Sequence, residues 1–240
     1  MTETQDPVPG APAQSEMLFA AEEAPSPRRY PAVYHPKSAT EQMARLAPLF
    51  PRLRAGALMP PPNLPAGAEG WFVFPDWRRL APNYNAALGE TLAVLARVRE
   101  TSLSRVDRLG PDRLRQSERA VALGATFEPA SGSDFLVLPA QFGARHAGHS
   151  IRHAREMFTA NEFGLGALAL ACMLLTHPER LAQADQLYVD GAGDEYSASD
   201  EAQYSEAPFF RFLDGRVGFG TSWIGFADPY FGSASAFTLR

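Results

Sequence analysis

The chain has 240 residues, of which 45% are hydrophobic, so it is long enough to form a globular core. Its formal net charge of −5 gives no general attraction to nucleic acid or to an anionic membrane. Cys172 is the only cysteine, which excludes an intrachain disulfide. Lys37 is the only lysine among 22 basic residues, a bias that favours a bacterial source with a GC-rich genome.

The N-terminal segment 1–36 is rich in proline and has no sustained hydrophobic period. Such a segment cannot bury enough apolar surface to offset the entropy lost on ordering, so we expect a disordered arm. Tyr30 and Tyr34 are candidate docking points for a protein partner of this arm. The first 15 residues also lack the basic and apolar regions of a secretory signal, and no apolar run is long enough to cross a membrane. We therefore expect a cytoplasmic protein.

Residues 37–69 are expected to hold a short helix followed by a proline-rich linker. The helix should cover 40–46, because Ser38 followed by Glu41 is the capping-box pattern. The folded domain is then expected to occupy 70–240.

Within this domain, hydrophobic periodicity and turn residues predict alternating helices and strands. The expected elements are a strand at 71–74, a helix from Asn83 or Asn85 to residue 99 that continues over 103–109, a helix from Asp112 to Leu123, a strand at 135–138, a helix from Ser150 to about Asn161, a helix at 166–175, a short helix after 176–179, a strand at 187–190 and a hairpin at Asp214-Gly215. The fold class predicted is α+β, a single domain of mixed helices around a small, largely antiparallel sheet, with a disordered Pro-rich N-terminal arm.

The segment 97–119 is rich in arginine, which raises the question of a nucleic-acid interface. Its arginines are interleaved with acidic residues such as Glu100, Asp107 and Glu118. Mixed signs of this kind are typical of a solvated helix surface, so nucleic acid is an unlikely partner.

The densest group of ionisable side chains lies in the segment 145–162. If a helix begins at Ser150, its core face and its polar face separate at helical spacing. The polar face and its flanks carry Arg145, His146, His149, Arg152, His153, Glu156 and Glu162.

A metal site is one hypothesis for this segment, because His149 and His153 have a spacing that suits zinc, with His146 or Glu156 as a third ligand. The zincin pattern, however, requires glutamate directly after the first histidine, where this chain has Ser150. The arginines of the segment would also repel a cation. We therefore expect no metal here.

An anion site suits the same residues better. Arginine forks match phosphate or carboxylate, histidine can move protons near neutral pH, and a helix N-terminus offers free N–H groups. In this hypothesis Arg145 and Arg152 bind the anion, while Glu162 orients the acid/base group. The candidate catalytic residues are His149, His153 and Glu156.

A second group of polar side chains follows the predicted strand 187–190. Asp190 ends this strand and Asp194 follows a glycine-rich turn, a placement that could bind a ligand or hold Mg²⁺ through water. The alternative is a solvated acidic loop.

Two classes of function remain open at this point. The first is a small domain that binds or acts on an anionic small molecule, such as one that carries phosphate, and the sequence leaves its cofactor unknown. The second is a non-catalytic interaction protein that uses the N-terminal arm and the aromatic C-terminal hairpin.

Overall fold

The computed structural model describes residues 21–103, 109–199 and 201–239. Its helices are α2 (Ala39–Leu46), α3 (Trp77–Leu80), α4 (Tyr84–Val98), α5 (Glu118–Gly124), the 3₁₀ turn η2 (Ala144–His146), α6 (Ile151–Met157) and α7 (Ala167–Thr176). Its strands are β1 (Gly70–Pro75), β2 (Thr101–Leu103), β3 (Leu114–Gln116), β4 (Phe135–Gln141), β5 (Glu162–Gly164), β6 (Tyr188–Asp190), β7 (Asp194–Tyr196), β8 (Glu206–Leu213), β9 (Arg216–Trp223), β10 (Phe231–Ser233) and β11 (Ser235–Phe237).

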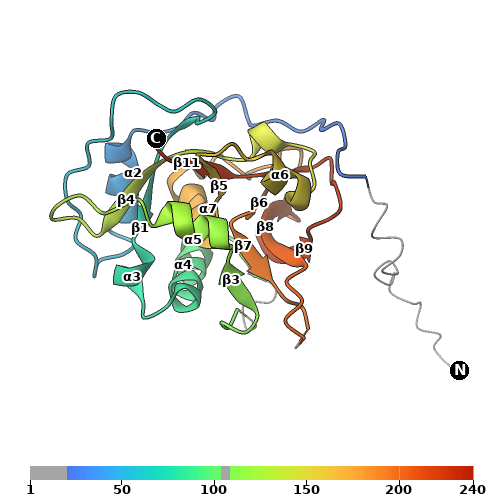
Figure 1. Cartoon of the computed structure of the whole chain (residues 1–240). Helices are drawn as coiled ribbons and strands as arrows, with labels where there is room; N and C mark the ends of the chain where they lie inside the picture. Colours follow the sequence, from blue (N-terminus) through green and yellow to red (C-terminus); the bar gives the residue numbers. More distant parts are fainter. Residues whose placement is uncertain (1–20, 104–108, 200, 240) are drawn as a thin grey trace, which may run out of the picture.

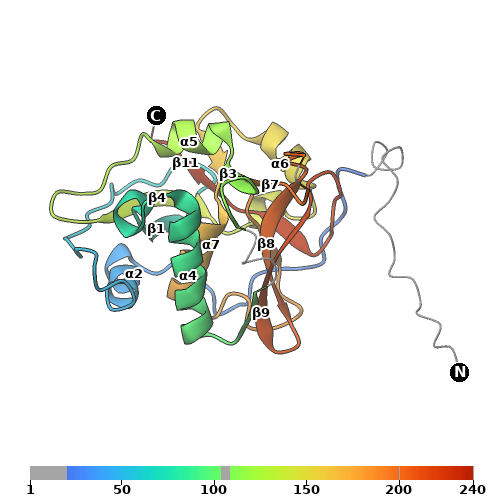
Figure 2. The same cartoon turned by 90° about the horizontal axis from the view of Figure 1, so that it is seen from below.

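Helix α7 is the centre of the fold. It is apolar on every side, and all of its residues except Ala169 are buried. A helix without a polar face must be covered all round. Contacts with α2, α4, β1 and β8 provide that cover, and Figure 2 shows α7 between the strands of two sheets with α4 alongside. The buried helix predicted at 166–175 is confirmed.

The strands form two sheets instead of the one small sheet expected. The first is antiparallel and has the order β1-β4-β11-β5. The second has seven strands, with β10-β6-β8-β7-β3 in one path and β9 joining β8 to β2. It includes two parallel pairs, β10 with β6 and β2 with β9. The predicted mixed α+β class is confirmed, whereas the description of its sheet was too simple.

Local capping and turn signals were predicted well. Ser38 and Glu41 form the expected capping box of α2, and Asn83 caps α4. The turn between β8 and β9 places Asp214 and Gly215 at φ angles of 52° and 77°, the left-handed region that a type I′ hairpin requires.

Three predicted helical segments differ from the structure. The predicted continuation over 103–109 meets strand β2 at its start, and residues 104–108 lie outside the described part of the chain. Where a helix was expected from Asp112, β3 forms first and Ser117 caps the shorter helix α5. The segment after α7 is a turn and not a helix. In the first two segments, pairing with distant strands outweighs the local helix signal.

The folded body begins before the expected boundary at Gly70. Met43 and Leu46 of α2, followed by Phe50 and Leu53, belong to the same hydrophobic core as α7. Among the described residues, no helix is both long and apolar enough to cross a membrane.

Residues 21–36, called the strap below, run along the surface of the body past α6 toward α2 (Figure 1). Backbone hydrogen bonds join Ala24 N–H to Gly148 O at 2.7 Å and Ser150 N–H to the carbonyl oxygen of Glu22 at 2.8 Å. The disorder predicted for 1–36 therefore does not hold for the strap. Residues 1–20 lie outside the described part of the chain, and for them disorder stays a prediction.

Two tyrosines anchor the far end of the strap. The hydroxyl groups of Tyr30 and Tyr34 donate to the half-buried carboxylate of Glu69, at 2.7 and 3.2 Å. The guanidinium group of the fully buried Arg180 lies 4.3 Å from the centre of the Tyr30 ring. Tyr30 and Tyr34, expected to be docking points for a partner, thus dock on the body of their own chain.

Gly148 sets how closely the strap can approach. Its φ is +78°, and a Cβ at this position would lie 1.9 Å from the carbonyl oxygen of Ala24. We predict that Gly148→Ala detaches the strap near this point and lowers the free energy of unfolding by about 2 kcal/mol or more. Urea unfolding measures the loss, and limited proteolysis should show faster cleavage within 21–36.

Gly89→Ala is the matched control. Gly89 lies in α4 with nothing within 4 Å of its would-be Cβ. This variant should gain about 0.5–1 kcal/mol from helix propensity and keep the strap protected. Equal protease sensitivity of the two variants would contradict the role given to Gly148.

Candidate functional site

Helix α6 carries the polar cluster predicted from the sequence. Ser150 caps it, accepting the N–H of His153 at 3.0 Å, but the helix ends at Met157 instead of near Asn161. His149 and His153 lie one turn apart, with ring centres separated by 5.5 Å. The Nδ1 atom of His153 is 3.5 Å from Glu156. The predicted arc therefore forms, and both histidine side chains are mostly covered, with 20% and 27% of their surface exposed.

The anion that this cluster holds belongs to the chain itself. The carboxylate of Glu22 accepts hydrogen bonds from the Ser150 hydroxyl and from the Arg152 guanidinium, whose Nε lies at 2.9 Å. Burial raises the pKa of Glu22, but the bonds from Ser150 and Arg152 outweigh burial and lower it overall. An external anion at Arg152 would have to displace Glu22.

The next strap residue reaches both histidines. The Glu23 carboxylate oxygen Oε1 lies 2.9 Å from His153 Nε2 and 3.8 Å from His149 Nε2. Burial lowers the pKa of His149, which favours its neutral imidazole. Sequence reasoning missed both Glu22 and Glu23, since they were assigned to a disordered arm.

Arg145 and Glu162 belong to a different network, in which Glu162 is buried and Arg145 is exposed. One Glu162 oxygen accepts the hydroxyl of Ser235 at 2.6 Å and contacts His146 Nε2 at 2.8 Å, while Arg145 lies 3.3 Å away. Burial raises the pKa of Glu162, but the bonds from His146 and Ser235 lower it to about 2. Because Ser235 and His146 both face the same carboxylate, the Ser235 hydroxyl is not paired with the His146 ring as nucleophilic catalysis would require. This network joins β5, β11 and η2.

Asp190 and Asp194 are both buried and lie at the ends of β6 and β7. Asp194 accepts the N–H of Ala167 at 2.7 Å and the hydroxyl of Tyr84 at 2.9 Å, and thus caps the N-terminus of α7. Burial raises the pKa of Asp194 to about 7. For Asp190, burial together with the nearby charge of Asp228 raises the pKa to about 8. The solvated acidic loop considered from the sequence is wrong for these two residues.

The site residues predicted from the sequence therefore divide into separate groups. His149, Arg152, His153 and Glu156 share the surface next to the strap, whereas the exposed Arg145 pairs with the buried Glu162. The anion-binding role of Arg145 and Arg152 stays a prediction, and both guanidinium groups are already paired with carboxylates of the chain.

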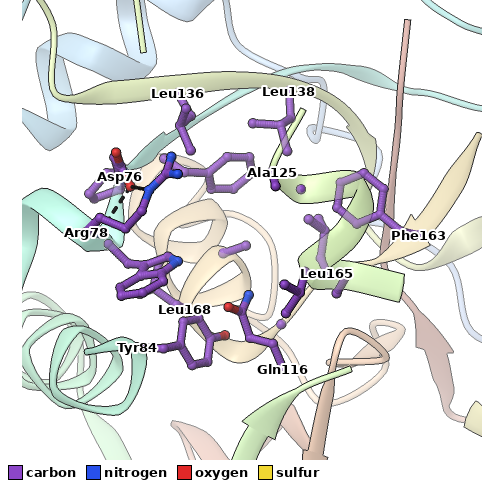
Figure 3. A pocket seen from close by; sticks show the side chains of 18 of the residues that line it. Asp76, Arg78, Tyr84, Gln116, Ala125, Leu136, Leu138, Phe163, Leu165 and Leu168 are labelled. Carbon is purple, nitrogen blue, oxygen red and sulfur yellow. Dashed lines mark hydrogen bonds and ion pairs between the residues drawn. The ribbon is translucent and has the colours of Figure 1, made fainter. Parts of the chain in front are cut away.

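A separate pocket lies between the first sheet and helices α3, α5 and α7. It has a volume of 210 Å³ and is predominantly apolar. Figure 3 shows Leu136, Leu138, Phe163 and Leu165 on its walls. Ala169 also lines it and is the one residue of α7 that is not buried, so the pocket opens onto the central helix.

Polar groups lie on two sides of this pocket (Figure 3). On one side, Arg78 donates its Nε–H to Asp76 at 2.8 Å, and 43% of the Arg78 side chain is exposed. On another are Gln116 and Tyr84. Because the Tyr84 hydroxyl proton goes to Asp194, its oxygen can accept a hydrogen bond.

Sequence reasoning did not identify this pocket. Its lining comes from strands and helices that are distant in the chain, and an apolar wall has the same local pattern as ordinary core. The one local signal was Asp76, which directly follows the strand that ends at Pro75. As an N-cap residue, Asp76 marks the start of α3.

Comparisons of the chain with protein-family models, with curated proteins and with solved structures found no match. Function must therefore be inferred from the geometry of the sites.

The buried aspartates predict an unusual dependence of stability on pH. A carboxyl group whose pKa is raised in the folded state binds its proton more tightly there than in the unfolded chain, so stability falls as pH rises toward the folded pKa. Below about pH 6.5 the buried His177, whose pKa burial lowers to about 4, has the opposite effect. Between pH 6.5 and 8 we predict that Asp190 lowers the free energy of unfolding by up to about 1.4 kcal/mol per pH unit.

Chemical denaturation across this range tests the prediction. Asp190→Asn keeps the size of the side chain and removes its titration, so the variant should gain stability over the parent protein as pH rises. Asp185→Asn, a change at an exposed aspartate, should follow the parent curve. Parallel curves for the parent and Asp190→Asn would contradict the raised pKa.

Proposed function

We propose that this chain binds a small amphipathic molecule, with an apolar body in the pocket between the first sheet and α7 and an acidic head at Arg78. The observation that carries the proposal is the pocket itself, a cavity of 210 Å³ with apolar walls and polar groups on two sides. Pockets of this composition, with a few polar groups that fix orientation, are the usual sites of small ligands.

The volume limits the size of the ligand. An engineered apolar cavity of about 150 Å³ holds one benzene molecule. A pocket of 210 Å³ therefore suits one or two rings or a short acyl chain. Its apolar side chains Leu138, Phe163 and Leu165 are each less than 10% exposed. An apolar group of the ligand that enters the pocket and packs against them is therefore removed from contact with water, which favours binding.

Arg78 decides the polarity of the ligand. Its Nε–H donates to Asp76. Its terminal nitrogens face the pocket side of α3, where they can donate to the carboxylate or phosphate of a ligand. Tyr84 and Gln116 can bind a donor elsewhere on the same molecule. This proposal keeps the anionic ligand expected from the sequence but moves it from Arg145 and Arg152 to Arg78.

A pair of probes that share an alkyl chain and differ in the head group, one anionic and one neutral, tests the proposal. Octanoate and octan-1-ol have the same chain length, and calorimetric titration should show about tenfold tighter binding of octanoate. Arg78→Met removes the charge and keeps the stem, so this preference should disappear. Arg79→Met, at the neighbouring exposed position of α3, should retain it.

A filled pocket is the complementary test. Ala169→Phe places a ring in the part of the pocket next to α7 and should weaken both probes at least tenfold, while circular dichroism confirms that the variant folds. Unchanged binding in Ala169→Phe, or a preference for octanoate that survives Arg78→Met, would overturn the proposal.

A further inference from the structure

We propose that Glu23, His149 and His153 form a binding site for a divalent transition metal of the zinc class, which bridges the strap and α6. The Nε2 atoms of the two histidines and one carboxylate oxygen of Glu23 all lie within 4.8 Å of one another. This site is separate from the apolar pocket and does not depend on the function proposed for it.

The distances match what a tetrahedral ion requires. Bonds of 2.0–2.1 Å to zinc place neighbouring ligand atoms about 3.3 Å apart. The two separations from Glu23 Oε1, 2.9 Å to His153 and 3.8 Å to His149, fall on either side of this value. All three ligand atoms lie within 4.8 Å of one another, so one ion can reach all of them, and a fourth position would remain for water.

The backbone fixes the ligands in relation to one another. Glu23 and His149 form an antiparallel bridge, and hydrogen bonds of the residues on either side, Ala24 with Gly148 and Glu22 with Ser150, close this pairing. His153 follows one helical turn later on α6. Because these backbone hydrogen bonds already hold the strap in register, the backbone that carries the Glu23 carboxylate does not have to be fixed when an ion binds.

The side chain of Glu156 also supports a role for His153 as a metal ligand. Its carboxylate lies 3.5 Å from Nδ1 of His153, on the ring edge opposite Nε2. A carboxylate on the second nitrogen is the usual partner of a histidine that ligates a metal, because it fixes the ring and the tautomer.

The arginines that argued against a metal all have hydrogen-bond or ion-pair partners within the chain. Arg152 pairs with Glu22, and Arg145 pairs with Glu162. Arg155 donates to the carbonyl oxygens of Ala192 and Asp194. With Arg152 balanced by Glu22, the carboxylates of Glu23 and Glu156 give the cluster a negative charge that attracts a cation.

The direct test is calorimetric titration of the full chain with zinc chloride after treatment with a chelator. One zinc ion should bind per chain. His149→Ala and His153→Ala should each weaken binding at least a hundredfold, because loss of a supporting partner alone typically costs 10–100-fold. Cobalt(II) should give the intense visible absorption of a four-coordinate site, and this band should be lost in both variants.

Two further variants keep the test independent of folding. Glu23→Gln changes a side chain that is 65% exposed, so the body remains folded while zinc binding weakens. His35→Ala removes an exposed histidine of the same strap and should leave binding unchanged. Bound zinc should also slow proteolysis within 21–36. Absence of zinc binding in the parent chain, or equal affinity in His149→Ala, His153→Ala and Glu23→Gln, would overturn the proposal.

Discussion

The carboxylate of Asp194 joins three parts of the fold at one point. It belongs to β7 of the second sheet, and it accepts hydrogen bonds from the first N–H of α7 at Ala167 and from Tyr84 of α4. The N-cap residue of helix α7 is Gly166, which has no side chain to cap the helix, and a Cβ there would lie 2.3 Å from a carboxylate oxygen of Asp194. The central apolar helix therefore depends on a capping group from 27 positions further along the chain. The hydrogen bond from Tyr84 to Asp194 also orients the Tyr84 hydroxyl at the edge of the apolar pocket.

The strap adds a second long-range constraint, on the opposite side of the fold from α4. Its far end is anchored where Tyr30 and Tyr34 meet Glu69, and its near end where Glu22 meets Arg152. Between these anchors the strap gains little apolar burial, and residues 21–30 alternate between exposed and half-buried. Polar contacts and backbone hydrogen bonds, rather than a hydrophobic face, thus decide where it lies. An ion at Glu23 would add a third attachment to the part with the least buried surface.

These interactions explain which features the sequence could predict. The helix caps Ser38, Asn83 and Ser150 act on neighbours three residues away, so their patterns are visible in a short window. The bond between Glu22 and Arg152 spans 130 positions and leaves no local pattern. The arc of His149, Arg152, His153 and Glu156 was predictable because one short helix creates it. Its carboxylate partners from the strap were not, since the composition of 1–36 indicates disorder.

The two proposed sites differ in how the protein prepares them. At α6, most charges are already matched within the chain, and the anionic ligand expected there is supplied by Glu22. The remaining group is the pair of imidazoles beside Glu23, an arrangement that suits a cation better than an anion. At the apolar pocket the balance is reversed, because Arg78 uses one N–H on Asp76 and retains donors at the rim of a cavity that is otherwise apolar. The density of arginines along the sequence therefore does not by itself tell which guanidinium groups lie beside space for an anion. The guanidinium groups at 145 and 152 each meet a buried or half-buried carboxylate, whereas Arg78 lies beside space that a ligand can fill.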